Sequence, residues 1–416
     1  MKSKKKIVTG ALLGTIVEYY DYSLYGWAAG ILALKFFPEL EKVQGLMYVF
    51  GIYAISYISK PLGSIIFSFI GDYYGRSVAL RITIIGIAIP TFVIGVLPDF
   101  HSIGVISTYV LISCRFIQGF FMGGEYDGAA IYVIEHLGKK HHYTASAITR
   151  AIGVIGLLLG VASVNFFNSS IFPEWAWRIP FLLSLPLALL TIYCRKFLVE
   201  TPDFSDSIEQ KIEISGISTF IKRNSLNLLM IIFLAGGMGV TYQLSIIFMK
   251  QYLLIVVPAT SIIMTSFSVL IVFVFGVSMP IAGLLADKFG KMIVVKFSLL
   301  LTLISSALIA AGIHYQIVNL VLISTIILAA SVAPFNALAH GVMIKAFPVN
   351  ERYRGVSLGH TIGSMLMSGT AGYISLYFMK EYKIMLFPVI YIAFFALVSF
   401  FVIYQFSKKY NRPIEK

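Results

Sequence analysis

The chain has 416 residues, of which 58% are hydrophobic and 12% are charged, and its mean hydropathy is +0.87. Soluble domains carry about 25% charged residues, so this composition excludes an ordinary soluble protein and indicates one that crosses a membrane many times. The formal net charge of +13 is better explained by a bias of lysine and arginine toward one membrane face than by nucleic-acid binding.

Twelve apolar segments follow one another along the chain, each long enough to cross about 30 Å of hydrocarbon as a helix. Helices are expected because a span in lipid must satisfy its own backbone hydrogen bonds. We therefore predict an all-α integral membrane protein. The spans are expected at about residues 8–35, 46–70, 77–97, 103–124, 143–167, 177–197, 225–248, 258–283, 292–312, 317–339, 355–379 and 384–405.

The distribution of cations sets the expected orientation of these spans. With the N-terminus placed in the cytoplasm, 23 lysines and arginines fall in cytoplasmic segments and 6 in external loops. Loops rich in these residues stay in the cytoplasm, so both termini are expected there. The first span is expected to remain uncleaved, because it is too long and too acidic for a signal peptide.

The longest polar stretch, residues 198–224, divides the spans six and six. We interpret it as a cytoplasmic linker between an N-terminal six-helix bundle, residues 1–197, and a C-terminal one, residues 225–416. A motif of small residue, Asp, any residue, aromatic residue, Gly and cation follows the second span and recurs after the eighth, which indicates duplication. Its candidate gating residues are Asp72, Gly75, Arg76, Asp287, Gly290 and Lys291, to which we add Arg352 and Arg354 from the tenth loop.

Seven charged residues lie within or at the ends of spans, all in the N-terminal half: Glu18, Asp21, Lys60, Arg115, Glu125, Asp127 and Arg150. Each charge at the bilayer centre costs roughly 2.5–3.5 kcal/mol on insertion scales, so these groups must face one another or a wet cavity. They form either a structural ion-pair network or a pathway for solute and protons. A carboxylate balanced between burial and a nearby cation can take and release a proton, which favours the second interpretation.

The first span supplies the sharpest pattern. Glu18, Asp21, Tyr22 and Tyr25 are spaced i, i+3, i+4 and i+7, which predicts one helix face that looks into the cavity, while Tyr19 and Tyr20 pack elsewhere. The predicted cavity residues are Glu18, Asp21, Tyr22, Tyr25, Lys60, Arg115, Gln118, Glu125 and Arg150.

In the C-terminal half the candidates are uncharged, and packing or hydrogen bonding is the simpler interpretation of each: Tyr242, Gln243, Asn336, His340 and His360. A histidine side chain ordinarily titrates near neutral pH, but the sequence gives no reason to prefer either of the two. The two cysteines lie far apart and predict neither a disulfide nor a metal site. No cofactor is expected.

These features carry a resemblance to a known family. The stretches concerned are Val17-Glu18-Tyr19-Tyr20-Asp21-Tyr22, Lys60-Pro61-Leu62-Gly63, Gly71 to Arg76, Arg115-Phe116-Ile117-Gln118-Gly119, Gly123-Gly124-Glu125-Tyr126, Glu200-Thr201-Pro202-Asp203-Phe204 and Arg352-Tyr353-Arg354-Gly355. With twelve spans in two halves, the chain resembles the major facilitator superfamily, and within it the metabolite:proton symporters, which include permeases for proline, betaine and organic acids. It departs from their pattern at Lys60, where Arg is usual, and at Asp127, where Gly is usual.

The resemblance implies a secondary active transporter in a bacterial inner membrane that moves a small polar organic solute with protons by alternating access. The three cations within spans favour a solute that carries a carboxylate, either a zwitterion such as proline or betaine or an organic acid. An uncoupled facilitator or an antiporter on the same fold is the first alternative. A membrane receptor or enzyme is a weaker one, because no catalytic triad or ATP-binding loop is recognisable in the sequence.

Overall fold

The computed structural model describes residues 4–74, 76–137, 142–195 and 217–410. Over these residues every regular element is a helix. The first part of the chain forms α1 (Lys4–Trp27), α2 (Ala29–Phe36), α3 (Lys42–Tyr74), α4 (Arg76–Val96), α5 (Phe100–Ile103), α6 (Val105–Leu137), α7 (His142–Phe167), η2 (Glu174–Arg178), α8 (Ile179–Leu182) and α9 (Ser184–Arg195).

The second part forms α11 (Ile217–Tyr242), η3 (Gln243–Phe248), α12 (Met249–Val256), η4 (Pro258–Thr260), α13 (Met264–Phe289), α14 (Lys291–His314), α15 (Val318–Met343), η5 (Ile344–Ala346), α16 (Val349–Gly363), η6 (Ser364–Ser368), α17 (Ala371–Glu381) and α18 (Phe387–Tyr410). Two of these short elements, η3 and η6, are π-helical. Helix α11 begins inside the predicted linker, and its non-helical residue Asn224 separates the segment 217–223 from the span that follows.

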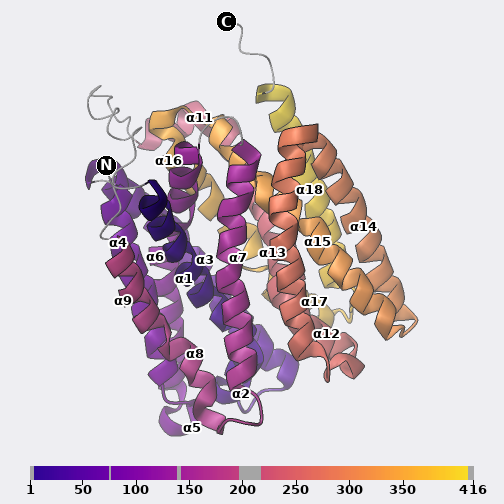
Figure 1. Cartoon of the computed structure of the whole chain (residues 1–416). Coiled ribbons are helices and arrows are strands. Elements are labelled where there is room, and N and C mark those ends of the chain that lie inside the picture. The colour runs from indigo at the N-terminus through magenta and orange to yellow at the C-terminus, as the bar shows by residue number, and fades with distance from the viewer. Residues whose placement is uncertain (1–3, 75, 138–141, 196–216, 411–416) are drawn as a thin grey trace, which may run out of the picture.

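In Figure 1, helices α1–α9 lie on one side and α12–α15, α17 and α18 on the other, with α7 and α13 side by side where the two groups meet. Helices α11 and α16 overlap the first group in this view but pack against each other, and α11 also packs against α15 and α18. We call residues 4–195 the N-half and residues 217–410 the C-half. Helix α1 begins and α18 ends at the same end of the bundle, which we call the terminal end (Figure 1). Loops 37–41 and 168–173 lie at the opposite end.

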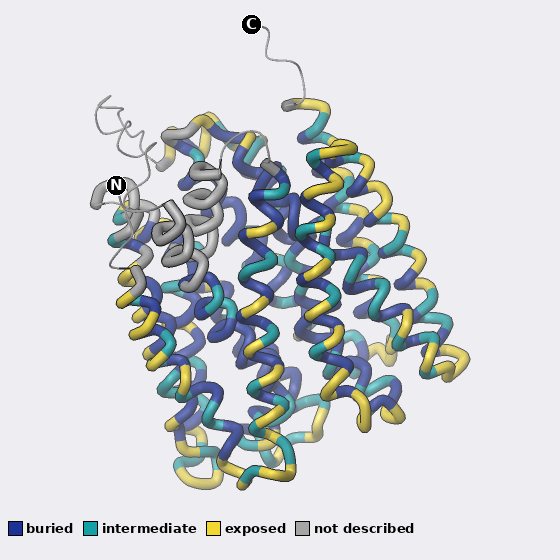
Figure 2. Tube along the Cα trace, in the orientation of Figure 1, coloured by how far each residue is buried: buried dark blue, intermediate teal, exposed yellow. Residues whose placement is uncertain are grey.

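Among the described residues, nine helices are long and apolar enough to cross a membrane. The three remaining predicted spans correspond to α1 with α2, to α4, and to α16 with α17, which are helical but shorter, more polar or only partly described. Large apolar residues are exposed, among them Ile89, Leu190, Leu284, Phe297 and Phe401. Exposed positions recur along the length of the outer helices (Figure 2). An exposed apolar surface of this extent fits contact with lipid chains.

Close helix packing in the N-half depends on small residues. A Cβ atom at Gly119 would overlap the carbonyl group of Ser56, and one at Gly123 would overlap the carbonyl oxygen of Lys60. These glycines therefore let α6 approach the backbone of α3, as small residues do between membrane helices. That approach fixes the position of Lys60 relative to α6.

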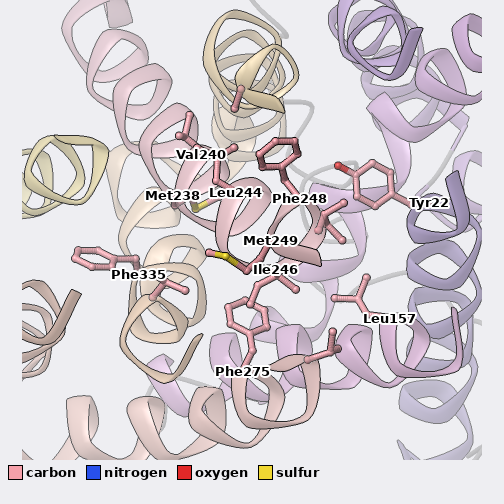
Figure 3. Packing of buried hydrophobic residues seen from close by; sticks show 14 of the residues in the cluster. Tyr22, Leu157, Met238, Val240, Leu244, Ile246, Phe248, Met249, Phe275 and Phe335 are labelled. Carbon is pink, nitrogen blue, oxygen red and sulfur yellow. The ribbon is translucent and has the colours of Figure 1, made fainter. Parts of the chain in front are cut away.

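One buried hydrophobic cluster runs through both halves. At their junction Ile246, Phe248 and Met249 of the C-half lie near Tyr22 and Leu157 of the N-half (Figure 3). The ring of Phe248 also meets that of Phe50 edge-on, with 5.2 Å between ring centroids. The two halves therefore share a packed core around the polar groups described next.

Candidate functional site

A cavity lies at the junction of the halves, and the space there that atoms do not fill is about 780 Å³, including space that is open to solvent. Its wall has a charged side and a neutral side. The N-half contributes Glu18, Tyr19, Tyr22, Tyr57, Lys60, Met122, Arg150 and Val154. The C-half contributes Met238, Gly239, Tyr242, Phe275, Met279, Asn336, His360, Thr361, Ser364 and Ser368.

The face of α1 that lines this cavity is not the predicted one. Glu18 and Tyr22 line it as expected, but Asp21 and Tyr25 do not, and Tyr19 does. Successive residues of an α-helix are about 100° apart, so Glu18, Tyr22 and Tyr19 span an arc of about 100°, whereas Asp21 lies about 60° beyond its edge. The predicted set had the correct helical period but was centred on the wrong side of Glu18.

Asp21 instead points into the N-half. Its side chain is 1% exposed, and neither carboxylate oxygen receives a hydrogen bond from a described residue. The hydroxyl of Ser184, on α9, lies beside it but donates to the carbonyl oxygen of Ala88 at 3.3 Å. Asp21 is therefore a buried acid one layer behind the cavity.

Arg150 connects the charged wall to the C-half. Its Nη1 donates to the hydroxyl of Tyr19 at 3.0 Å, and its Nη2 lies 2.7 Å from Nδ1 of His340 on α15. Glu18, 2% exposed, lies on the same cavity wall. A carboxylate, a guanidinium and an imidazole thus lie in or directly beside one cavity.

Lys60 lies against two tyrosines of the wall. Its ammonium nitrogen is 4.0 Å from the ring centroid of Tyr57 and 4.9 Å from that of Tyr22, both within cation–π range. The two tyrosine hydroxyls form a hydrogen bond with each other. A protein cation therefore already lies against the aromatic faces of Tyr22 and Tyr57, where a solute ammonium could otherwise bind.

Arg115 and Gln118 lie behind the cavity rather than on its wall. Arg115 is fully buried; it donates to Oε1 of Gln118 at 2.7 Å and to the hydroxyl of Ser56 at 3.0 Å. Its guanidinium carbon lies 4.5 Å from the ring centroid of Tyr25 and 4.9 Å from that of Tyr53. This explains why Tyr25 also leaves the cavity face, because it packs against the arginine inside the N-half.

The second copy of the repeated motif forms a contact between the halves. The Asp287 carboxylate accepts hydrogen bonds from the backbone amide of Tyr143 at 3.1 Å, the amide of Thr144 at 2.9 Å and the Thr144 hydroxyl at 2.6 Å. These amides belong to the first turn of α7, where the helix dipole favours an anion. Gly290 has a φ of +90°, which favours glycine at the turn between α13 and α14.

The structure describes the side chains of some of the other predicted gating residues but not of all. Lys291 is buried, with its ammonium 5.9 Å from the ring centroid of Tyr143. Arg354 lies over the ring of Phe220, and Arg352 is part of the same segment of α16. Gly75 lies outside the described residues. The structure describes the helical backbone but not the side chains at Asp72, Arg76, Glu125 and Asp127.

A second hollow, with about 2120 Å³ of unfilled space, opens at the opposite end of the bundle between the two halves. Lys250, on α12, crosses it by donating to Oδ1 of Asn165 at 2.8 Å. Lys35 forms an exposed ion pair there with Glu174, at 3.6 Å between nitrogen and oxygen. The junction is thus hollow at the opposite end, whereas at the terminal end the hydrogen bonds of Asp287 join the two halves.

Sequence reasoning missed part of the C-half wall. Thr361, Ser364 and Ser368 line the cavity from α16 and η6 but have no distinctive spacing in the sequence. Tyr57 lies three residues before Lys60, and that helical spacing could have identified it. Over the residues described, no group of three or more histidine, cysteine, aspartate or glutamate side chains is arranged to hold a metal ion.

Comparisons with known proteins agree with this architecture. The sequence model of the family described as "Sugar (and other) transporter" matches residues 7–215. The proline/betaine transporter of Salmonella typhimurium is 28% identical, over 99% of this chain and 85% of the relative. The glycine betaine/proline/ectoine/pipecolic acid transporter OusA of Dickeya dadantii is also 28% identical, with the same coverage. The major facilitator superfamily proton:xylose symporter XylE, bound to 6-bromo-6-deoxy-D-glucose, has a TM-score of 0.75 at 16% identity and covers 96% of this chain and 95% of its own.

The fold and these matches define a multi-pass membrane transporter of the major facilitator superfamily, not an enzyme. The chain belongs to the sugar (and other) transporter family. Its predicted resemblance to the metabolite:proton symporters is confirmed by the proline and betaine transporters among its relatives.

Proposed function

We propose that the protein is a secondary active transporter that carries a small carboxylate-bearing solute together with protons by alternating access. The observation that carries this proposal is the cavity at the junction of the halves, because Glu18, Lys60 and Arg150 line it together. A binding site that two rigid halves enclose can be opened to either side by rocking one half against the other.

The cavity chemistry supports an anionic group on the solute. Lys60 and Arg150 are two cations on one wall, and a carboxylate can accept charge-assisted hydrogen bonds from both. A solute ammonium would have to displace Lys60 from Tyr22 and Tyr57 or use Glu18 instead. The names of the relatives favour a zwitterion such as proline or betaine, whereas the occupied tyrosine faces favour an organic acid.

Proton coupling is assigned to the buried acids of α1. Glu18 lines the cavity with the solute-binding cations, so its protonation would change the charge that the solute meets. Asp21 is the second candidate, one layer behind the wall. We infer that Glu18 takes and releases the transported proton, because, of the two acids, it is the one that lines the cavity, where solute and proton can influence each other directly.

The predicted arrangement completes the proposal. Twelve spans form two six-helix bundles, residues 1–197 and 225–416, joined by the cytoplasmic linker 198–224. The 23 to 6 distribution of lysine and arginine places both termini on the cytoplasmic side of the inner membrane. The terminal end is then the cytoplasmic end, and the structure represents a state closed to the cytoplasm.

Uptake into liposomes tests the proposal. The purified protein is reconstituted, and the uptake of radiolabelled proline, betaine, 2-oxoglutarate, citrate or shikimate is measured with and without an inward proton gradient. Accumulation above the external concentration that requires the gradient supports proton symport. Equilibration without accumulation would indicate a facilitator, and stimulation by an outward gradient an antiporter. Transport of neutral sugars or polyamines alone would refute the carboxylate assignment.

A further inference from the structure

Three hydrogen bonds join α7 of the N-half to α15 of the C-half beside the cavity. The Ser146 hydroxyl donates to the carbonyl oxygen of Ala337 at 2.7 Å and accepts from the amide of Gly341 at 3.2 Å. One turn along α7, the Arg150 guanidinium meets Nδ1 of His340 at 2.7 Å. The first two bonds involve no group that titrates near neutral pH, but the third does.

The Arg150–His340 bond can exist in only one protonation state. A guanidinium has donors and no acceptor, so Nδ1 of His340 must be the acceptor and must carry no proton. The single ring proton of the neutral imidazole is then on Nε2, so a second proton, on Nδ1, would leave two cations with their hydrogens facing each other. Both side chains are almost completely buried, at 6% exposed for Arg150 and 1% for His340, so little solvent would screen this repulsion.

A second histidine connects this contact with the cavity. His360, on α16, lines the cavity, and its ring centroid lies 5.7 Å from that of His340, with the two rings nearly perpendicular at 78°. The Arg150–His340 contact therefore lies directly beside the cavity, with His360 and Arg150 both on the cavity wall. The contact is also next to Tyr19, which bonds the other terminal nitrogen of Arg150.

The charges around this pair come from several helices. Toward the terminal end, Tyr143 of α7 lies near three charged groups of the C-half, and toward the cavity the wall carries one carboxylate and several tyrosines. The titratable and charged groups concerned are Arg150 and Tyr143 from α7, His360 from α16, Glu18 and Tyr19 from α1, Tyr242 from α11, Asp287 from α13, Lys291 from α14 and Lys345 from η5.

We propose that His340 links protonation to the gate: a proton on its Nδ1 breaks the bond to Arg150 and favours separation of the halves at the terminal end. This inference rests on the proposed function, in which Glu18 remains the acid of the cavity. His340 is a positioning residue, because it acts through Arg150 and not on the solute. A proton loaded in the closed state would thus promote opening toward the side where it is released, which is the order that symport requires.

The test measures opening of the terminal end without using a solute. Ser146 is 1% exposed between the halves, so a Ser146→Cys substitution places a thiol of similar size where closure hides it. All variants carry this change together with Cys114→Ser and Cys194→Ser. Labelling by N-ethylmaleimide is measured in inside-out vesicles for a few minutes after a shift to about pH 5.5 or about pH 8. These values lie on either side of the ordinary histidine pKa of about 6.5. The rate is corrected for the reactivity of the thiol itself with a free thiol peptide at each pH.

With His340 present, we expect the corrected labelling to be roughly tenfold faster at the acidic pH, equivalent to about 1.4 kcal/mol. His340→Asn keeps an acceptor near the position of Nδ1 but cannot titrate, so its labelling should stay slow at both pH values. His340→Gln serves as a second variant, and slow labelling at about pH 8 shows that either variant is folded and closed. His314→Asn, at the end of α14, is the matched control and should keep the pH response.

Two results would overturn the inference: a labelling rate independent of pH with His340 present, or a pH response that persists in both His340 variants. A response that is lost in Glu18→Gln and kept in His340→Asn would also overturn it, because the proton would then act through Glu18 alone. Failure of the proposed function is seen separately. A pH-dependent gate that requires His340, with no gradient-driven uptake of any solute in the panel, would support the gate and refute the symport.

Discussion

Replacing Asp287 by Asn should weaken the closed state of the terminal end. The carboxylate is partly buried and accepts three hydrogen bonds, two from backbone amides in the first turn of α7 and one from the Thr144 hydroxyl. Asparagine has nearly the same size and keeps one oxygen acceptor. It loses the negative charge that strengthens the hydrogen bonds and interacts with the helix dipole.

The size of the effect follows from these contacts. A hydrogen bond to a charged group contributes about 1.5–3 kcal/mol, against about 0.5–1.5 kcal/mol for a neutral one, and the dipole adds about 0.3–1 kcal/mol. Partial exposure of Asp287 reduces these values, so we expect the closed state to lose about 1–2 kcal/mol relative to the open one. This corresponds to an increase of roughly 5- to 30-fold in the ratio of open to closed molecules.

The cysteine at position 146 reports this change as a faster reaction with N-ethylmaleimide at constant pH. Thr144→Val removes one of the three hydrogen bonds to the carboxylate and should also make this reaction faster. Lys288→Gln is the matched control, since Lys288 is the exposed neighbour of Asp287 and should leave the rate unchanged. The reasoning is refuted if Asp287→Asn is labelled no faster than Lys288→Gln.

Three further predictions follow from the site. Glu18→Gln should abolish solute accumulation driven by a proton gradient, while solute exchange at equal pH persists. Asp21→Asn should affect accumulation less. Normal accumulation in both variants would exclude the acids of α1 as the coupling groups. Lys60→Gln should raise the solute dissociation constant roughly 10- to 100-fold, because a hydrogen bond to a charged group contributes about 1.5–3 kcal/mol. An unchanged dissociation constant would show that Lys60 does not bind the solute. Cysteines at Ser205 and Ser169 should be labelled from opposite sides of the membrane, and labelling of both from one side would contradict the proposed orientation.

The sequence predicted the helical fold well because lipid imposes a simple rule on it. Each span must be apolar and must bond its own backbone, so hydropathy alone indicates where most helices lie. Helix ends were harder to predict, and α11 begins at Ile217, inside the expected linker. Its first turns contain the polar residues Lys222, Arg223 and Asn224, which in the sequence resemble a loop. In the structure Arg223 and Asn224 both donate hydrogen bonds to the Glu351 carboxylate of α16.

The site was only partly predictable, for a reason that α1 illustrates. Helical spacing identified Glu18 and Tyr22 as neighbours but could not fix how α1 is rotated about its axis. That rotation depends on the side chains that pack behind the helix. There Tyr25 packs against the Arg115 guanidinium, and Asp21 lies beside Ser184. The pairing of residues distant in sequence, such as Arg150 with His340, also depends on how α7 and α15 meet, and no local pattern encodes that.

The two π-helical segments have a consequence for how the cavity could change shape. Tyr242 directly precedes η3, and Ser364 and Ser368 belong to η6, so both segments border the cavity. A π turn holds one residue more than an α turn, so returning either segment to α geometry would turn the helix beyond it by about 100° and shift it by about 1.5 Å. Helices α12 and α17, which follow η3 and η6, could therefore each rotate about their axes if these segments became α-helical. Over the described residues such π segments are found only in the C-half, so a change of this kind would move the C-half wall of the cavity relative to the charged wall of the N-half.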